Sequence, residues 1–352
     1  MGSNEDHFTY ALQISSSISM TMMLDSAIKL KVLEAIAMAG PDAKLSAHEI
    51  ASRLSISNQD APDKIDRMLR LLASHSIVTC SQQDHQSKPI RVYGLTPVAK
   101  YFIPNKDGSS LGLGPSVLLL HDKVFIDSWF AFKDSVMEGG VPFNKVHGTH
   151  LYEYPSLDSR FNDVFNTAMD SHTVIAMSRI LECYHGFKEL KSVVDVAGGL
   201  GININMIVSK YPTIKGINFD LPHVIRNAPH YPGVEHVGGD MFKEVPQGDA
   251  IFMKWILHNW SDDRCLALLK NCYKALPDNG KIISVEAILP FMPNTSPIDK
   301  LNMHIDAAMM THNPGGKERT EDEFLTLAKG AGFTGIKKAC FASALWVMEF
   351  YK

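Results

Sequence analysis

The C-terminal part of the sequence alternates short apolar runs with segments of helical periodicity, and this alternation restricts the possible folds more than any other feature. The apolar runs indicate buried strands: Val193–Val196, Gly216–Phe219, Val234–Val237, Ala250–Met253 and Ile282–Val285. Each run is followed by a turn and a helix candidate. This pattern predicts an α/β fold with a doubly wound parallel sheet, in which ligands bind at the carboxyl ends of the strands. The segment Lys337–Tyr351 predicts two further strands at the sheet edge.

The residues before this alternation are predicted to be mainly helical. Helical periodicity runs from about Ala11 to Ala39, and a second helix is expected at about Pro62–Ser74. Ser46 and Glu49, between them, have the spacing of a capping box. Two strand-like runs then flank the polar loop Ser81–Pro89, which is similar to the wing of a winged helix: Ile77–Cys80 and Arg91–Leu95.

These patterns divide the chain into three expected domains. Residues 1–110 are expected to form a winged-helix-like domain that is mainly α-helical, and residues 191–352 a Rossmann-like domain. Residues 111–190 are expected to form a helical connector, with helices at about Ser116–Met137 and Ser159–Tyr184.

Winged helices also occur in DNA-binding proteins, but the charge of this chain argues against that function. The formal net charge is −4 and the isoelectric point about 6.4, so no overall positive field holds phosphates or anionic lipids. The second helix carries Asp63 and Asp66 among its basic residues. We therefore expect no nucleic-acid or membrane partner. We favour the alternative that the apolar helices of this domain form a dimer interface.

The cysteines and the N-terminal residues predict a reduced, cytoplasmic protein. The 5 cysteines are scattered without a C-x-x-C pair, which argues against a disulfide framework and against a zinc site. The first residues lack the basic and apolar regions of a signal peptide, and no apolar run approaches the roughly 20 residues of a membrane span. His147 and His150 lie in an irregular segment without nearby carboxylates, so we interpret them as structural and expect no metal.

A glycine-rich turn, Ala197 to Gly201, directly follows the first predicted strand. Gly198 and its neighbours provide a nearly side-chain-free backbone at the place where such folds bind a nucleotide. A nicotinamide-binding fingerprint would require a third glycine at position 204, which is Ile204. The turn therefore favours another nucleotide-containing cofactor.

Two acidic residues follow the next two predicted strands. Asp220 is placed to accept hydrogen bonds from both hydroxyls of a ribose, and Asp240 to accept one from an adenine amino group. The apolar side chains of Met241 and Phe242 follow Asp240 and are suited to an adenine ring. Together these three strand ends indicate S-adenosylmethionine, with S-adenosylhomocysteine as the product. The alternative is that the two carboxylates only cap the following helices.

A histidine and two glutamates form the candidate catalytic group. His258 follows the fourth predicted strand, Glu286 ends the fifth, and Glu318 lies in a polar loop. A phenol has a pKa of about 10, so it is a poor nucleophile at neutral pH until a base removes its proton. An imidazole can act as that base, and carboxylates can orient its ring and stabilise the imidazolium. The scheme requires no metal.

These motifs are similar to those of the plant caffeic acid and flavonoid type O-methyltransferases, particularly the caffeic acid and catechol branch. The similarity extends from about Leu12 to Lys352 and includes several blocks: 66–72, 93–96, 234–242, 254–260 and 313–320. It implies a homodimer with an N-terminal dimerisation domain, a methyltransferase core and a reaction that needs no metal.

The resemblance also assigns expected roles to individual residues. It implies that His258 is the base, assisted by Glu286 and Glu318. The implied cofactor contacts are Asp220, Asp240, Met241 and Lys254, together with the turn at Ala197 and Gly198. The implied pocket for a small aromatic substrate, which includes residues of the connector, is lined by Leu120, Phe161, Phe165, Met169, Trp255, Met309 and Asn313.

Four positions depart from the pattern of the family. Ala197 replaces the usual first glycine of the turn, a change that is tolerable if its φ is negative, and Asn259 replaces an aspartate. Leu120 and Pro155 stand where the caffeic acid enzymes have asparagine and histidine. We therefore expect a phenol less polar than caffeic acid, such as a phenylpropene, a methoxyphenol, an alkaloid or another phenylpropanoid. N-methylation of an aromatic amine and a non-catalytic or DNA-binding dimer remain as alternatives.

Overall fold

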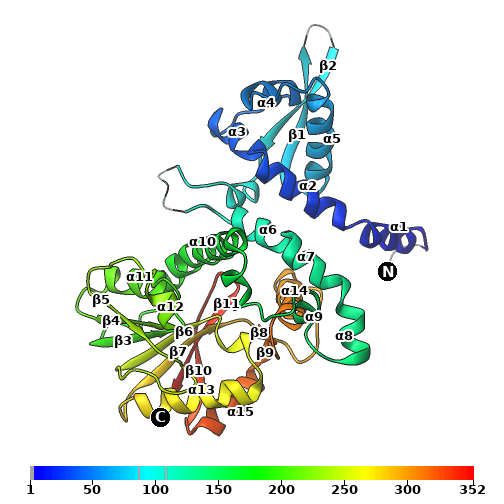
Figure 1. The fold of residues 1–352 in the computed structure, drawn as a ribbon. Helices are drawn as coiled ribbons and strands as arrows, with labels where there is room; N and C mark the ends of the chain where they lie inside the picture. Colours follow the sequence, from blue (N-terminus) through cyan, green and yellow to red (C-terminus); the bar gives the residue numbers. More distant parts are fainter. Residues whose placement is uncertain (1–3, 86–87, 107, 109) are drawn as a thin grey trace. The chain divides into compact units, whose positions relative to one another are not determined.

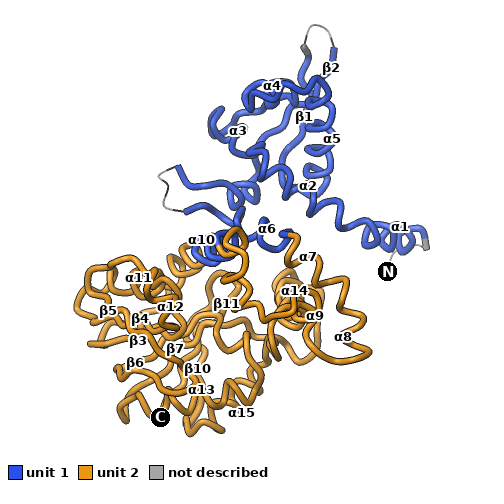
Figure 2. The backbone as a smooth tube through the Cα atoms, in the orientation of Figure 1, with its two compact units in different colours: residues 1–122, 163–172 blue, residues 123–162, 173–352 orange. Residues whose placement is uncertain are grey.

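The computed structural model describes residues 4–85, 88–106, 108 and 110–352, and the chain divides into two compact units. Figure 2 shows them in different colours: the first comprises residues 1–122 and 163–172, the second residues 123–162 and 173–352. The expected connector at 111–190 is thus shared between the units. The long helix α10 (Ser159–Cys183) contributes residues to both.

The first unit consists of short helices and one β-hairpin. Its elements are α1 (Asn4–Ser15), α2 (Ile18–Lys29), α3 (Val32–Met38), α4 (Ala47–Arg53), α5 (Ala61–Ser74), β1 (Val78–His85), β2 (Lys88–Leu95), η1 (Ala99–Phe102) and α6 (Gly114–Leu120). The periodic stretch 11–39 therefore forms three helices. One interruption is at Lys31, whose φ of 59° lies outside the helical region.

Packing of α2, α4 and α5 with the hairpin forms the core of the first unit. Ile50, Leu69 and Tyr93 are fully buried there. The predicted capping box is confirmed, since Ser46 and Glu49 exchange side-chain-to-backbone hydrogen bonds at the start of α4. The polar loop predicted at 81–89 was wrong for most of its length, because β1 and β2 pair from Val78↔Leu95 to His85↔Lys88. Residues 86 and 87 of that loop lie outside the described residues.

The second unit contains a sheet with seven strands in the described chain, in the order β10-β11-β7-β6-β3-β4-β5 (Figure 1). All five predicted strands are present: β3 (Ser192–Val196), β4 (Lys215–Asp220), β5 (Val234–Gly238), β6 (Ala250–Lys254) and β7 (Lys281–Glu286). The prediction that they are buried was wrong for β5, which lies at the sheet edge and is only partly buried. These five are parallel. The predicted strand pair at the edge is also present, as β10 (Gly335–Ala342) and β11 (Leu345–Tyr351), and β11 is antiparallel to β7.

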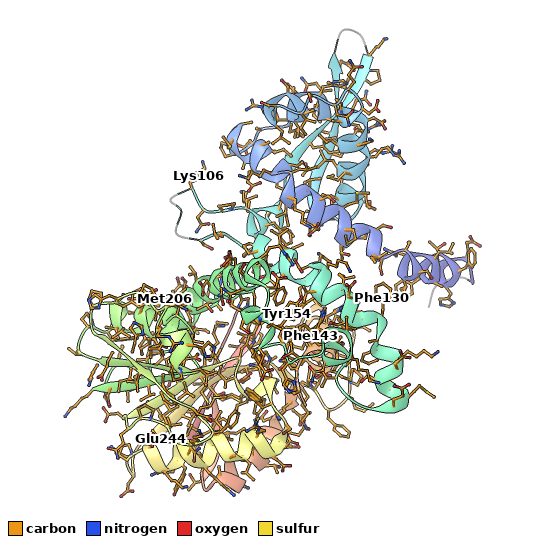
Figure 3. All side chains as sticks on the ribbon, in the orientation of Figure 1. Lys106, Phe130, Phe143, Tyr154, Met206 and Glu244 are labelled. Atoms are coloured by element: carbon orange, nitrogen blue, oxygen red, sulfur yellow. The ribbon has the colours of Figure 1, made fainter. Side chains whose placement is uncertain are left out.

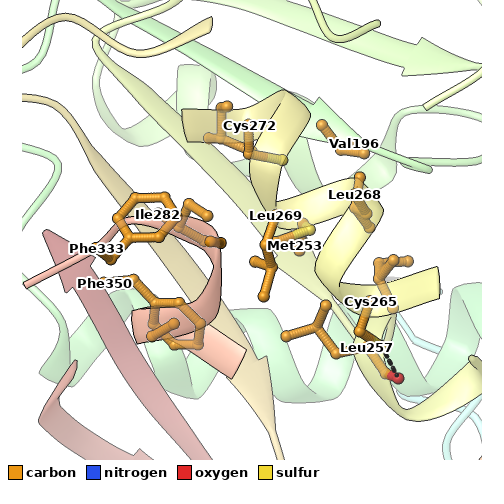
Figure 4. Packing of buried hydrophobic residues seen from close by; sticks show 14 of the residues in the cluster. Val196, Met253, Leu257, Cys265, Leu268, Leu269, Cys272, Ile282, Phe333 and Phe350 are labelled. Atoms are coloured by element: carbon orange, nitrogen blue, oxygen red, sulfur yellow. Dashed lines mark hydrogen bonds between the residues drawn. The ribbon is translucent and has the colours of Figure 1, made fainter. Parts of the chain in front are cut away.

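Helices cover both faces of this sheet. On one face α10 and α11 (Ile202–Lys210) pack against apolar residues of β3, β6, β7 and β11. On the other face lie α13 (Asp262–Ala275) and α15 (Glu321–Ala331). Figure 4 shows part of the core on this face, in which leucines and cysteines of α13 lie beside apolar residues of the strands. The prediction that a helix follows every strand was wrong for β5. A turn and an irregular segment lead from it to β6.

The remaining elements of the second unit are short helices and strands before β3, between strands of the sheet, or between β7 and α15. They are α7 (Lys123–Phe130), α8 (Phe132–Glu138), α9 (Pro142–His147), η2 (Tyr154–Ser156), α12 (Pro222–Ile225), η3 (Leu257–Asn259), β8 (Ile288–Leu289), α14 (Pro297–His312) and β9 (Arg319–Thr320). The helix predicted at Ser116–Met137 is thus divided into α6, α7 and α8. Phe143 and Tyr154, both labelled in Figure 3, meet edge to face at 5.7 Å and contribute to an aromatic cluster between α7, α9 and α14.

Candidate active site

The glycine-rich turn leaves no space for a side chain at Gly198. A Cβ atom there would lie 2.3 Å from Asn218 Oδ1 and 2.5 Å from Asp195 Oδ2. Ala197 has a φ of 55°, in the left-handed region. The expectation that alanine is tolerated here depended on a negative φ, and this condition is not met. A non-glycine residue in the left-handed region costs roughly 1–2 kcal/mol.

Side chains of β4 hold the turn in place. Gly199 donates its backbone N–H to Asp220 Oδ2 at 2.8 Å, and Asn218 Nδ2 donates to the carbonyl of Gly199 at 2.9 Å. His236 on β5 lies 3.1 Å from the same amide nitrogen of Asn218. Neither Asn218 nor His236 was predicted from the sequence. Polar residues within predicted buried strands were the only signal for them.

A second buried carboxylate, Asp195, lies beneath the turn and was also missed. Burial raises the pKa of Asp195 to about 7, and the nearby Asp220 carboxylate adds to this effect while Lys254 opposes it. Burial likewise raises the pKa of Asp220, against the hydrogen bonds from Gly199 and Leu221. A positively charged ligand in this turn would stabilise both ionised carboxylates.

The segment after β5 is ordered around Asp240. Asp240 Oδ1 accepts a hydrogen bond from the backbone of Phe242 at 2.9 Å, and Asn271 donates to the carbonyl of Met241 at 3.0 Å. Phe242 packs edge to face on Trp260 at 5.0 Å. Asp240 precedes a turn rather than a helix, and α12, after Asp220, has no side-chain cap in the described structure. The helix-capping interpretation therefore accounts for neither carboxylate.

His258 lies on η3, immediately after β6, and is paired with Glu318. The distance from His258 Nδ1 to Glu318 Oε1 is 2.6 Å, and the two residues are 5% and 3% exposed. Glu286 Oε1 accepts hydrogen bonds from the backbone N–H groups of Ile256 and Leu257, so Glu286 also orders the turn. Ligand-type atoms of all three side chains lie within 4.8 Å of one another. The structure thus brings the predicted catalytic residues together.

The carboxylates control the proton affinity of this group. Burial lowers the pKa of His258, but the charge and hydrogen bond of Glu318, with the charge of Glu286, outweigh burial and raise it. Burial raises the pKa of Glu286 to about 7, with the nearby His258 acting in the opposite direction. The pair is therefore suited to holding an imidazolium once the ring has accepted a proton.

Trp255 and Lys254 lie next to the histidine. The indole of Trp255 stacks on the imidazole with ring centroids 5.7 Å apart, and Lys254 Nζ is 4.5 Å from the centroid of Trp255. Trp255 has a φ of 57°, an unfavourable conformation that often marks functional sites.

An amide pair connects this turn to the end of α14. Asn259 Nδ2 donates to the carbonyl of Trp255 at 2.8 Å, and Asn259 Oδ1 accepts from Asn313 Nδ2 at 2.7 Å. Asn313 Nδ2 also lies 3.2 Å from the sulfur of Met309. Three of the predicted substrate residues, Trp255, Met309 and Asn313, are therefore linked to the catalytic turn.

The other predicted substrate residues differ in their placement. Phe161 is fully buried and packs against Phe125 and Tyr154 at 5.6 and 5.5 Å, as expected of a core residue. Leu120, Phe165 and Met169 belong to the first unit, so their part in the pocket stays a prediction.

His147 and His150 both contact neighbouring polar groups. His147 bonds to the carbonyl of Val124, and His150 lies 2.8 Å from the amide of Asn144. Among the described residues, the possible metal-binding group that was found contains neither histidine.

No helix in the described part of the chain is long and apolar enough to cross a membrane.

Family models match two segments of the sequence. Residues 129–334 match the O-methyltransferase domain, and residues 12–105 match the O-methyltransferase dimerisation domain. The chain therefore belongs to the O-methyltransferase family, in which it is an S-adenosylmethionine-dependent enzyme of the α/β methyltransferase fold.

Within that family it groups with plant caffeic acid and catechol enzymes. It is 56% identical to caffeic acid 3-O-methyltransferase of Medicago sativa over 99% of this chain and 96% of the relative. It is 55% identical to catechol O-methyltransferase 1 of Solanum lycopersicum and 54% identical to esculetin O-methyltransferase of Kitagawia praeruptora, over 99% of this chain and 96% and 95% of those relatives.

Solved structures share the fold along the whole chain. The structure of LaPhzM is 26% identical and has a TM-score of 0.76, covering 97% of this chain and 98% of its own. Human N-acetylserotonin methyltransferase in complex with SAM is 19% identical and has a TM-score of 0.83, covering 100% and 99%.

Proposed function

We propose that this enzyme methylates a phenolic hydroxyl of a small aromatic specialised metabolite, with His258 as the general base. The observation that carries the proposal is the buried contact of 2.6 Å between His258 Nδ1 and Glu318 Oε1, with the Glu286 carboxylate beside it. We further propose that the enzyme acts as a cytoplasmic homodimer and needs no metal.

The hydrogen bond to Glu318 defines how the base works. Donation of the Nδ1 proton to the carboxylate leaves the lone pair of Nε2 free to accept the phenolic proton. The carboxylates of Glu318 and Glu286 then stabilise the positive ring that forms. Because the resulting phenolate is a much stronger nucleophile than the phenol, proton removal makes methyl transfer possible at neutral pH.

The residues around the turn fit S-adenosylmethionine. We assign the ribose hydroxyls to Asp220 and the adenine to Asp240, Met241 and Phe242, with Lys254 at the edge of the site and the backbone of Ala197 and Gly198 next to the ligand. When bound, the sulfonium supplies an electrophilic methyl group and a good leaving group. The absence of space for a Cβ at Gly198 and the buried carboxylates at Asp195 and Asp220 support a cationic ligand with close backbone contact.

We infer that the acceptor is less polar than caffeic acid. Trp255, Met309 and Asn313 would line its ring, together with Leu120, Phe161, Phe165 and Met169. Leu120 and Pro155 offer no hydrogen bond to a carboxylate, aldehyde or alcohol tail. A phenylpropene, a methoxyphenol, an alkaloid or a less polar phenylpropanoid fits such a site better.

The test is a panel of phenols, catechols, alkaloids and aromatic amines assayed with labelled S-adenosylmethionine. His258→Ala is expected to lower kcat for the best phenol on the order of 10²–10⁴-fold and to leave cofactor affinity unchanged. As a control, the surface substitution His48→Ala should leave kcat unchanged. Caffeic acid turned over faster than every less polar phenol would contradict the substrate class.

The same panel tests the alternatives. An aromatic amine does not need a base, because its nitrogen is already nucleophilic. Preferential methylation of amines that persists in His258→Ala would favour N-methylation. DNA binding in a gel-shift assay, without thermal stabilisation by the cofactor, would favour the non-catalytic dimer.

A further inference from the structure

We propose that Arg319 is a positioning residue for the catalytic base: its guanidinium holds the backbone on both sides of His258 and thereby sets the position of the imidazole. This inference rests on the proposed role of His258 and goes beyond the three side chains already assigned to catalysis.

Arg319 is fully buried, and its guanidinium is directed at the catalytic turn. Arg319 Nη1 donates to the carbonyl of Leu257 at 2.7 Å, and Nη2 donates to the carbonyl of Trp260 at 2.8 Å. These two carbonyls belong to the residue before His258 and the second residue after it. The carbonyl of Leu257 also accepts the 3₁₀ hydrogen bond from the backbone N–H of Trp260, at 3.3 Å, so the guanidinium binds both ends of this short turn.

Three consecutive residues contact the same turn. Lys317 donates its backbone N–H to the carbonyl of His258 at 2.9 Å, and Glu318 accepts from the imidazole. Arg319 then binds the flanking carbonyls. Since successive side chains of an extended segment point to opposite sides, one short segment can hold both the ring and the backbone that carries it.

Other groups complete the attachment of the turn. Glu286 binds the N–H groups of Ile256 and Leu257, so the turn is held through its N–H groups by one residue and through its carbonyls by another. The thiol of Cys265 also donates to the carbonyl of Leu257, at 3.1 Å (Figure 4). The turn therefore has little freedom to move while Arg319 is in place.

The charge of the buried guanidinium is balanced by Asp262. Asp262 Oδ1 accepts from Nε at 2.9 Å and from Nη2 at 2.8 Å, and it lies at the start of α13. A lysine at this position has one compact ammonium and cannot bind two carbonyls and a carboxylate in this planar arrangement. Arg319→Lys thus keeps the positive charge but loses most of these hydrogen bonds.

The experiment compares Arg319→Lys with Arg91→Lys. Arg91 makes a similar two-pronged contact with Asp66 in the first unit, where Nε and Nη2 lie 3.0 and 2.7 Å from the two carboxylate oxygens. We expect kcat per cofactor-binding site to fall on the order of 10–100-fold in Arg319→Lys, because a shift of about 1 Å in a reacting group can cost 10²-fold. Binding of S-adenosylhomocysteine should remain within about twofold. Arg91→Lys should change neither quantity.

A second readout separates positioning from simple destabilisation. A weaker contact between His258 and Glu318 should move the acid limb of the kcat profile to lower pH. A purely structural role would instead lower the number of S-adenosylhomocysteine sites and the melting temperature, without changing turnover per site or the pH profile. That result, or an Arg319→Lys enzyme with kcat within twofold of wild type, would overturn the proposal.

Asp262→Asn provides an independent variant if Arg319→Lys does not fold. It keeps the guanidinium and removes its half-exposed charge partner. We expect a severalfold loss of kcat with the same pH shift, and unchanged kcat would count against the positioning role.

His258→Ala distinguishes the two proposals. A fully active His258→Ala enzyme would refute the proposed function. An inactive His258→Ala enzyme together with a fully active Arg319→Lys enzyme would refute only the role of Arg319.

Discussion

Ala197 carries a side chain in a backbone conformation that normally favours glycine. Its φ of 55° is accompanied by the positive φ values of Gly199 and Gly201, so the whole turn has an unusual course. Hydrogen bonds from Ala197 and Gly198 to the carbonyl of Phe219, together with the contacts of Asn218 and Asp220, hold it there. The surrounding structure therefore maintains a conformation that the alanine itself disfavours.

Replacement of Ala197 by glycine should strengthen cofactor binding. The change removes a methyl group beside the ligand, from which we expect a severalfold decrease in Kd for S-adenosylmethionine, measured by calorimetry. Relief of about 1 kcal/mol of backbone strain should in addition raise the melting temperature. Ala344 is a matched control, since its φ is 66° in the turn between β10 and β11. Ala344→Gly should affect only the melting temperature, and an equal change of affinity in both variants would contradict the local explanation.

The charges around His258 predict the pH dependence of the reaction. The carboxylates raise the pKa of His258 above its usual range, and the base acts only when it is neutral. Activity should therefore fall as the pH decreases through a value above the usual pKa of histidine, near 6.5. Glu318→Gln removes a negative charge and should therefore lower the pKa of His258. The acid limb of the remaining activity should move to lower pH, measured as kcat/KM from pH 5 to 9. An unshifted limb would assign the titration to another group.

At the scale of elements, the sequence predicted the strands of the second unit better than the first unit. The runs at β3, β6 and β7 are apolar because helices cover both faces of the sheet, and such runs are recognisable without a structure. The hairpin β1–β2 was missed over the polar residues 81–85, since backbone pairing rather than apolar alternation maintains it. The break between α2 and α3 lies at Lys31, a residue type without a preference for positive φ, so the sequence did not indicate it.

The sequence likewise predicted only some of the residues of the candidate site. Four site residues could be predicted because they lie at or soon after the ends of recognisable strands: His258, Glu286, Asp220 and Asp240. Glu318 could be predicted because it lies in a polar loop and provides a second carboxylate for the histidine. Asn218, Asp195 and Arg319 could not, because each lies within a strand or loop where nothing in the sequence distinguishes a functional polar residue from a structural one. Their significance depends on contacts between segments far apart in the chain.

At the scale of the whole molecule, the first unit has its own core and an exposed apolar helix surface. Ile18 is 63% exposed on α2, and Met22 one turn later is 39% exposed. Residues 12–105 match a dimerisation domain, which supports the proposal that a second copy of the chain covers such residues. Exposed apolar patches of this kind are typical of permanent interfaces.

This predicts that the enzyme sediments at about twice its chain mass of 39.0 kDa. Ile18→Asp combined with Met22→Asp should shift the protein toward the monomer, because two charges would be buried at the interface. Ser15→Asp with Ser19→Asp adds the same charges at exposed polar positions nearby and should leave the dimer intact. Analytical ultracentrifugation distinguishes the outcomes, and identical behaviour of the two double variants would place the interface elsewhere.

The position of β11 in the sheet has a consequence for biosynthesis. Trp346 on β11 pairs with Glu286 on β7, and residues of β11 contribute to the core on both faces of the sheet. On the ribosome, β11 emerges after every other strand of this sheet, so β7 remains an open edge for as long as translation of the intervening residues lasts. The nascent chain can thus form the core of its first unit early, whereas the strand that carries Glu286 acquires its second neighbour only after the residues between β7 and β11 have been translated.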